Sequence, residues 1–108
     1  MQFKKNNNKQ PLMLRDIPNE PWVMIELDLF YFRGSDWLLI IDYFSKYVEG
    51  VKLQTSDSIS VINISKSIFA RFGIPKELCS DNGPQFESFA MRKFTIKWNI
   101  DHKISSPY

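Results

Sequence analysis

The sequence SDNGPQF, at residues 80–86, joins an acidic residue to two strong turn signals. Asn-Gly and Gly-Pro dipeptides are typical of turns, and the preceding residues 74–79 (IPKELC) form a short, partly apolar run with an early proline. We therefore expect Asp81 to lie where a strand ends and the chain leaves a sheet. Because ligand-binding residues gather at the carboxyl ends of strands in α/β sheets, Asp81 is a candidate functional residue.

The best upstream partner for Asp81 is Asp28, in the apolar sequence WVMIELDLF at residues 22–30. An acid in so apolar a strand is costly to bury unless it is paired or binds a metal. The two-residue period of a strand places Asp28 and Glu26 on one face, and both faces are largely apolar, which is typical of a central strand covered on both sides. Two such acids on neighbouring strands would form a site for a hard cation that prefers oxygen ligands.

Apolar periodicity and turn signals divide the rest of the chain into an α/β pattern, β-β-β-α-β-α-β. The first three strands follow one another through short turns, which predicts an antiparallel meander. A helical crossover back to the first strand then gives a mixed sheet. The expected strands are residues 23–32, 37–43, 47–53, 77–80 and 100–105, and the expected helices are residues 57–72 and 85–98.

Composition excludes several classes of protein. The chain has 108 residues, enough for one domain, and 44% hydrophobic residues, which is ordinary for a globular core. A single cysteine excludes an internal disulfide and a cysteine-rich zinc site. The longest apolar run is too short to span a membrane and no signal peptide is visible, so we expect a soluble, intracellular protein without a membrane partner.

Residues 1–20 have the composition of a flexible arm or linker. The first ten residues are polar and asparagine-rich, and prolines at positions 11, 18 and 21 favour an extended chain before the first strand. Lysines in this arm would contact phosphates in one interpretation and would be solvated in the other. We therefore expect residues 1–20 to be an arm and residues 21–108 to form the folded domain.

Seven segments, taken in order, resemble the catalytic core of retroviral-type integrases, and most of all the integrases of gypsy-like LTR retrotransposons. They are residues 11–12 (PL), residues 17–22 (IPNEPW), the Asp28 strand, residues 42–47 (DYFSKY), residues 68–75 (IFARFGIP), residues 80–86 and residues 105–108 (SSPY). The resemblance implies the ribonuclease H-like fold, incomplete at the C-terminus, with residues 21–108 as a partial integrase catalytic core. In that fold the first strand is central and the fourth lies beside it in parallel, which would bring Asp28 and Asp81 together.

The resemblance implies phosphoryl transfer on DNA by a metal-dependent polynucleotidyl transferase. Asp28 and Asp81 match the first two catalytic acids of the family and would hold Mg²⁺ or Mn²⁺. Asn82 and Gln85 are candidate contacts to nucleic acid, although turn geometry explains Asn82 equally well. The implied partners are the DNA ends of the element and target DNA, with a homo-oligomer and a nuclear or intracellular location.

The family's third catalytic acid is a Glu about 35 residues beyond the second Asp, where it completes a two-metal arrangement. Only 108 − 81 = 27 residues follow Asp81, so we expect this acid to be absent and the chain to be inactive alone. Glu87 follows the turn directly and does not match that position. The alternative is a domesticated or decayed fragment that binds nucleic acid or protein without catalysis. A ribonuclease H-like nuclease of another family is disfavoured by residues 83–86 (GPQF).

Three other polar residues have two interpretations each. Asp42 matches a family position, and a structural role on a neighbouring strand is favoured. Glu26 shares the face of Asp28, and a local feature is favoured over an assisting metal ligand. His102 is the only histidine, and a polar strand residue is favoured over a ligand.

Overall fold

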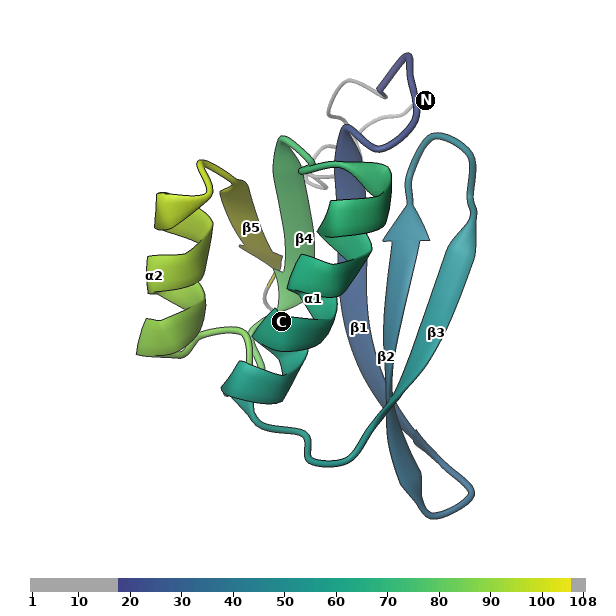
Figure 1. The fold of residues 1–108 in the computed structure, drawn as a ribbon, viewed down its shortest axis with the longest axis vertical. Coiled ribbons are helices and arrows are strands. Elements are labelled where there is room, and N and C mark those ends of the chain that lie inside the picture. The colour runs from purple at the N-terminus through teal and green to yellow at the C-terminus, as the bar shows by residue number, and fades with distance from the viewer. Residues whose placement is uncertain (1–17, 106–108) are drawn as a thin grey trace, which may run out of the picture.

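The structure, a computed structural model, describes residues 18–105 and contains one five-stranded sheet with two helices (Figure 1). The elements in chain order are β1 (Met24–Phe32), β2 (Ser35–Asp42), β3 (Val48–Leu53), α1 (Ser58–Phe72), β4 (Glu77–Asp81), α2 (Phe89–Lys97) and β5 (Asp101–Ser105). The predicted β-β-β-α-β-α-β order is confirmed. Most of the predicted arm lies outside the described residues. No helix of residues 18–105 is both long and apolar enough to cross a membrane.

The strands are ordered β3-β2-β1-β4-β5 across the sheet. β1 pairs with β2 in the antiparallel sense, as β2 does with β3, whereas β4 is parallel both to β1 and to β5. The predicted mixed sheet is therefore confirmed, with β1 at its centre and β4 beside it (Figure 1).

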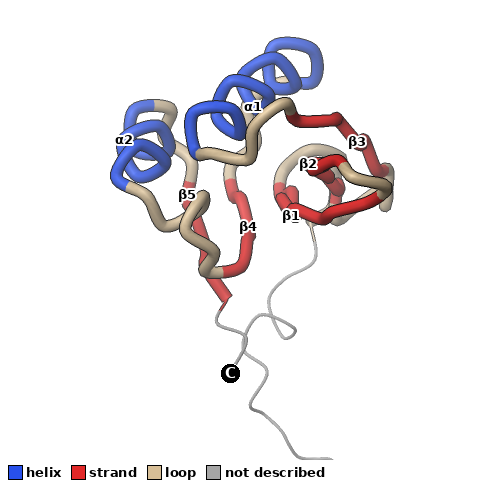
Figure 2. Tube along the Cα trace, turned by 90° about the horizontal axis from the view of Figure 1, so that it is seen from below, coloured by secondary structure: helices blue, strands red, loops and turns tan. Residues whose placement is uncertain are grey.

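Both helices lie on the same face of the sheet (Figure 2). The chain passes from β3 through α1 to β4 and from β4 through α2 to β5, so both crossovers move across the sheet in one direction. Since such crossovers are right-handed, they place both helices on one side. The core lies between the sheet and these helices, and its buried members include Ile25, Leu27, Leu38, Ile40, Val61, Ile68, Phe69, Leu78, Met91 and Phe94.

The prediction that both faces of β1 are covered is confirmed in part for residues 18–105. Helices pack only on the side of Ile25 and Leu27 (Figure 2); on the opposite side Met24 is 5% exposed, whereas Phe30 and Phe32, nearer the hairpin, are 38% and 50% exposed. Asp28 shares that second face and is half-buried. The alternation of apolar residues shows that a face is apolar, but it does not show which segment covers it.

Most element boundaries differ from the predictions by a residue or more, and the two largest differences at the start of an element have local reasons. The hairpin between β1 and β2 turns at two residues, Arg33 and Gly34, with φ of 53° and 79°. Positive φ at both central residues is the conformation that matches the twist of paired strands, so β2 begins at Ser35. The second helix begins at Phe89, four residues later than predicted, because residues 83–87 form a turn that precedes it.

Asp42, at the end of β2, has a structural role. Its side chain is 2% exposed and lies on the helix side of the sheet, opposite Ile25. The carboxylate accepts hydrogen bonds from the Trp22 N–H at 2.9 Å, the Ser45 N–H at 3.1 Å and the Ser45 hydroxyl at 2.7 Å. Burial raises the pKa of Asp42, but these hydrogen bonds outweigh it and hold the pKa below 3.8. The carboxylate thus joins the start of β1 to the turn after β2.

We expect Asp42→Asn to lower the free energy of unfolding by about 2 kcal/mol at neutral pH, because charge-assisted hydrogen bonds are lost. A group whose pKa is lowered on folding stabilises the folded state at pH values above its unfolded pKa. That stabilisation is lost as the pH falls through its folded pKa. The difference from the wild type should therefore shrink below pH 3.8. Urea denaturation across this range measures it. Asp36→Asn is the control, since the Asp36 carboxylate accepts no hydrogen bond from the described residues 18–105. Equal losses in both variants would contradict the assignment.

Candidate active site

The turn after β4 fixes the position of Asp81. The Gly83 N–H donates a hydrogen bond of 2.9 Å to Asp81 Oδ1, so the side chain closes over its own turn. A Cβ on residue 83 would lie 3.1 Å from that oxygen, closer than ordinary contact. Glycine at position 83 therefore permits the close approach that orients the carboxylate.

The same turn is anchored to α1 and to the core. The Gly83 carbonyl accepts hydrogen bonds from the N–H groups of Phe86 and Glu87 at 2.9 and 3.0 Å. Phe86 is 2% exposed and belongs to the core. The Ser58 hydroxyl, on α1, donates to the Gln85 carbonyl at 3.1 Å. Asp81 is thus followed by a segment whose backbone is fixed by hydrogen bonds and whose Phe86 side chain is buried in the core.

The sheet register aligns Asp28 with Asp81. The parallel ladder of β1 and β4 ends with Glu26 opposite Cys79, and two residues further along each strand, 26 + 2 and 79 + 2, lie Asp28 and Asp81. Residues opposite each other in neighbouring strands point to the same face. Both acids therefore belong to the face that the helices leave uncovered. Asp81 is the last residue of β4, and Asp28 lies midway along β1, just beyond the ladder with β4. Strands within a ladder lie about 4.8 Å apart, and the last paired residues, Glu26 and Cys79, lie two positions before the acids.

The uncovered face is electrostatically suited to a cation. Partial burial raises the pKa of Glu26 above 4.5, and the neighbouring charge of Asp28 raises it further. Repulsion between like charges disfavours the ionised pair, and a bound cation would relieve it. Among residues 18–105, however, no group of three or more acidic, histidine or cysteine side chains is arranged to hold a metal ion.

The two predicted nucleic-acid contacts flank the turn. Asn82 is exposed immediately after Asp81, and Gln85 is half-buried. The Gln85 carbonyl is engaged by Ser58 and, at 3.4 Å, by the Ser88 hydroxyl. Both side chains are adjacent to the candidate metal site, and their contact with DNA stays a prediction.

His102 lies apart from the two acids. Its Nε2 is 2.8 Å from the Ser80 hydroxyl, and its position opposite Leu78 places it on the helix side of the sheet. Burial lowers the pKa of His102, although the charge of Asp101 opposes this. The structure supports the interpretation of His102 as a polar strand residue.

Ser58 is a residue that the sequence analysis missed. It lies 27 residues before its partner carbonyl, and no local pattern marks a serine on the first turn of a helix as an anchor for a distant loop. The signal that could have found it is the expectation that α1 crosses from β3 to β4. Such a crossover places the start of α1 beside the carboxyl end of β4.

The sheet order and the crossovers define the class of domain as ribonuclease H-like, present here in part. Residues 17–108 match the integrase core domain family, and the chain belongs to that family.

Relatives come from retroviruses and from transposable elements. The chain is 39% identical over 77 residues to the Gag-Pol polyprotein of Koala retrovirus, an overlap of 69% of this chain and 5% of that protein. It is 28% identical to an uncharacterized protein of Caenorhabditis elegans, over 96% of this chain and 9% of that protein. A retrovirus-related Pol polyprotein from transposon 297 of Drosophila melanogaster is 25% identical over 93% of this chain and 9% of that protein. The chain therefore spans less than a tenth of the length of these relatives.

Solved structures show the same fold. The catalytic core domain of BIV integrase superposes with a TM-score of 0.73 and 18% identity, over 81% of this chain and 57% of that chain. The HTLV-2 integrase catalytic core domain in complex with magnesium gives a TM-score of 0.74 and 21% identity, over 81% of this chain and 62% of that chain. At these identities the likeness concerns the fold, and the predicted integrase-core architecture is confirmed.

Proposed function

We propose that this chain carries the first two acids of a metal-dependent polynucleotidyl transferase that acts on DNA. The observation that carries the proposal is the register of the sheet. β1 and β4 are parallel neighbours, and continuing their register by two residues beyond Glu26 and Cys79 brings Asp28 level with Asp81, although the two acids are 81 − 28 = 53 residues apart in sequence. Family membership and the core structures of relatives support the same assignment.

The residues fit a hard divalent cation such as Mg²⁺ or Mn²⁺. Both groups are carboxylates, and half-buried Asp28 lies on a strand while exposed Asp81 lies on an anchored turn. Such ions, when bound, activate a water or a sugar hydroxyl and stabilise the leaving oxygen of an in-line displacement. The magnesium bound to the HTLV-2 integrase core supports this choice. The chain's own part is to hold two sets of carboxylate oxygens at a fixed spacing.

A complete site needs a further acid. After Asp81 the sequence contains only Glu87 and Asp101 as acidic residues, and both are exposed. Asp101 begins β5 opposite Glu77, at the far end of β4 from Asp81. We therefore propose that residues 1–108 bind a cation weakly and do not catalyse transfer unaided. In the complete protein, DNA ends and target DNA would be the substrates, within an oligomer with a nuclear or intracellular location.

Metal binding by the 108-residue chain tests the site itself. Addition of Mn²⁺ should broaden the amide NMR signals of residues 26–28 and 80–83, because a paramagnetic ion relaxes nearby nuclei. We expect Asp28→Asn and Asp81→Asn each to weaken the affinity by about tenfold, since each removes one charged ligand. Glu87→Gln is the matched control, because Glu87 is exposed next to the turn and should not bind the ion.

The outcomes of this titration separate the two candidate functions. Broadening centred on Asp28 and Asp81 and lost in both variants supports the metal site. Broadening that is absent, or unchanged in Asp81→Asn, removes Asp81 from the site and favours a non-catalytic binding fragment. Loss in Glu87→Gln would show that the acid just after the turn is the second ligand.

A further inference from the structure

A pocket of about 490 Å³ lies at the end of the sheet away from Asp81. Three segments of the chain meet there: the residues before β1, the turn between β2 and β3, and the C-terminal end of α1 (Figure 1). β4 starts at this end, where the Glu77 N–H donates to the Val23 carbonyl at 3.0 Å, and it runs away from the pocket to Asp81. The lining residues include Pro21, Trp22, Asp42, Ser45, Tyr47 and Phe72.

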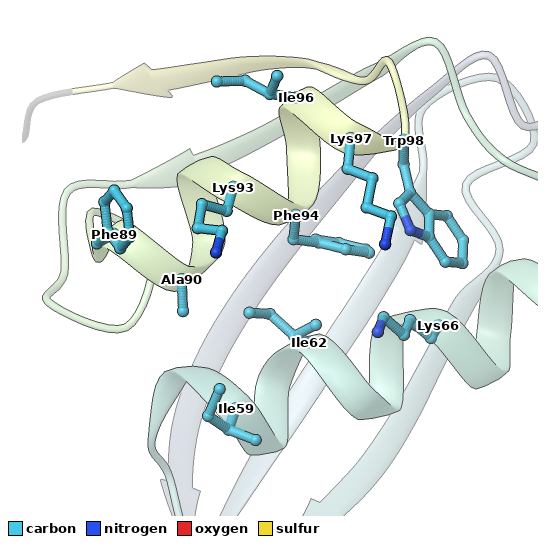
Figure 3. A pocket seen from close by; sticks show the side chains of 10 residues that line it. All are labelled: Ile59, Ile62, Lys66, Phe89, Ala90, Lys93, Phe94, Ile96, Lys97 and Trp98. Atoms are coloured by element: carbon cyan, nitrogen blue, oxygen red, sulfur yellow. The ribbon is translucent and has the colours of Figure 1, made fainter.

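A second hollow, the groove between α1 and α2, is a different surface (Figure 3). Its apolar walls include Ile62, Phe94 and Trp98, and Lys66 and Lys93 also line it. None of these residues lines the pocket at the end of the sheet. The two hollows can therefore be tested independently.

Three aromatic side chains form walls of the pocket at the end of the sheet, which we call the aromatic pocket. The ring centres of Trp22 and Phe72 are 5.0 Å apart with planes at 37°, and those of Tyr47 and Phe72 are 6.0 Å apart with planes at 53°. The rings are tilted and do not stack flat on one another. Phe72 and Tyr47 are 42% and 49% exposed, so part of each ring is open to a ligand.

The rings of the aromatic pocket are held in position by their polar groups. The Trp22 indole N–H donates to the Gly73 carbonyl at 2.6 Å, and the Tyr47 hydroxyl donates to Glu49 at 2.8 Å. The backbone of Trp22 has a φ of 67°, which is an outlier for so bulky a residue. Such a conformation costs free energy and persists where surrounding contacts impose it, often at binding sites. The pocket is thus formed before any ligand binds.

The aromatic pocket also contains a buried negative charge. Asp42 lines it and is 2% exposed. Burial raises the pKa of Asp42, but its hydrogen bonds outweigh this and hold the pKa below 3.8, so the carboxylate is ionised at neutral pH. No basic side chain of residues 18–105 forms an ion pair with it. A cation in the pocket would provide the opposite charge that buried carboxylates usually have.

Two basic residues adjoin lining residues in the sequence, and both are engaged elsewhere. Lys46 Nζ lies 5.7 Å from the centre of the Tyr43 ring. Arg71 forms an ion pair with Glu49, and its guanidinium carbon lies 5.0 Å from the centre of the Phe72 ring. Because Glu49 balances the charge of Arg71, that residue does not neutralise Asp42.

The surroundings of Asp42 select the kind of cation. One carboxylate oxygen accepts from the Trp22 N–H and the other from the N–H and hydroxyl of Ser45, so the group offers charge more than a free acceptor. A primary ammonium would lose its hydration in the pocket and find few acceptors for its N–H groups. A quaternary ammonium has no N–H group to satisfy, and the faces of aromatic rings attract its charge.

We propose that the aromatic pocket binds a quaternary ammonium group, such as that of choline or of trimethyllysine. The rings of Trp22, Tyr47 and Phe72 surround the methyl groups, and the Asp42 carboxylate provides the opposite charge. The proposal does not depend on metal binding, because neither candidate metal ligand lines the pocket.

Titration of the 108-residue chain with tetramethylammonium chloride tests the proposal. The readout is two-dimensional NMR, in which each tryptophan indole N–H gives its own signal. We expect shifts in the indole signal of Trp22 and in the amide signals of Ser45 and Tyr47. The affinity should lie in the millimolar range, because the ligand has few atoms. Ammonium chloride at the same concentration is the control for ionic strength and should leave these signals unchanged.

Two further comparisons test the charge and the source of the ligand. The neutral alcohol with a tert-butyl group in place of the trimethylammonium group of choline should bind about tenfold more weakly than choline, since the attraction between cation and rings is lost. Lysine should likewise bind more weakly than trimethyllysine. Tighter binding of trimethyllysine than of choline supports a modified protein side chain as the source, and the reverse order supports choline or its headgroup.

Matched variants test the walls of the aromatic pocket. Phe72→Leu and Tyr47→Leu keep an apolar side chain without the ring, and each should weaken tetramethylammonium binding about fivefold. Tyr47→Phe retains the ring and should retain the affinity. Phe32→Leu is the control, because Phe32 is 50% exposed and does not line the pocket. Thermal melting of every variant shows that the chain remains folded.

Asp42→Asn tests the charge in the pocket. The change also destabilises the domain, so the comparison is made within the folded variant, between choline and its neutral analogue. We expect the preference for choline to fall about threefold, because one charge pair is removed. An undiminished preference would show that Asp42 does not act on the ligand.

Other results would overturn the site as a whole. Equal affinity of the wild type for choline and its neutral analogue would remove the role of charge. Unchanged affinity in both Phe72→Leu and Tyr47→Leu would show that the rings do not bind the ligand. Shifts centred on the indole signal of Trp98 would identify the groove between α1 and α2 as the binding site instead.

Discussion

Residues 1–108 alone should neither trim nor join DNA ends, whereas the chain completed with the downstream segment of a relative's integrase core should join them. This expectation rests on the proposed function. In that proposal Asp28 on β1 and Asp81 at the end of β4 hold part of a metal site, but in-line displacement requires ions fixed by a further carboxylate. The assay is joining of a labelled duplex end to plasmid DNA, with Mg²⁺ and with chelator.

In the completed protein, Asp28→Asn should lower the joining rate by about a thousandfold, which corresponds to about 4 kcal/mol of transition-state stabilisation. Asparagine keeps the size of the side chain but provides one neutral oxygen in place of a carboxylate. Glu87→Gln is the control and should leave the rate within about twofold, since surface substitutions have small effects. Robust joining by residues 1–108 alone would show that the third ligand is already present, and Glu26 would be the first residue to test.

The sequence predicted the order of elements because each carries a local signal. Both helices are preceded by residues that cap them, Asp57 and Ser88, whose side chains accept hydrogen bonds from the backbone N–H three residues on. The strands are short apolar runs bounded by turns. Residues 80–86 predicted the end of β4 to within one residue, since the expected strand ended at residue 80 and Asp81 is the last residue of β4.

Which face of the sheet the two helices cover could not be predicted, because it depends on the direction of two crossovers and not on the sequence of any one strand. Phe30 and Phe32 look like core residues in sequence, yet they are exposed where β1 extends into its hairpin. The groove between α1 and α2 could not be predicted from the sequence either. Lys66 and Lys93 are 27 residues apart on different helices, and only packing places them beside the same apolar walls.

The residues of the candidate site could be proposed from the sequence, and their role as metal ligands stays a prediction. Asp28 and Asp81 were singled out because acids are rare in apolar strands and at such turns. The contacts that hold the turn after Asp81 are long-range, and a serine on α1 provides one of them. The sequence therefore identifies candidate functional side chains more readily than the residues that hold them in position.

The turn after Asp81 should also limit the stability of the domain. Phe86 is 2% exposed in the core, and its N–H donates to the Gly83 carbonyl at 2.9 Å. Phe86→Ala removes a buried ring and leaves a cavity, so we expect a loss of about 3–5 kcal/mol in the free energy of unfolding. Domains of this size are stable by about 5–15 kcal/mol, so the variant should be partly or wholly unfolded.

Phe89→Ala is the matched control for stability, because Phe89 lies three residues later in the same segment and is 69% exposed. Its effect on the free energy of unfolding should stay within about 0.5 kcal/mol. Urea denaturation followed by tryptophan fluorescence measures both variants. Similar losses in the two would mean that the segment is not anchored through Phe86.

A milder change links this anchor to the site. Phe86→Leu keeps an apolar side chain in the core and should leave the domain folded, with a smaller loss of stability. If Phe86 orients the turn, Mn²⁺ affinity should fall in Phe86→Leu although both acids are intact, because a carboxylate on a loosened turn is no longer preorganised. If the affinity is unchanged, the hydrogen bond between Gly83 and Asp81 is sufficient to orient the carboxylate, and Phe86 contributes stability alone.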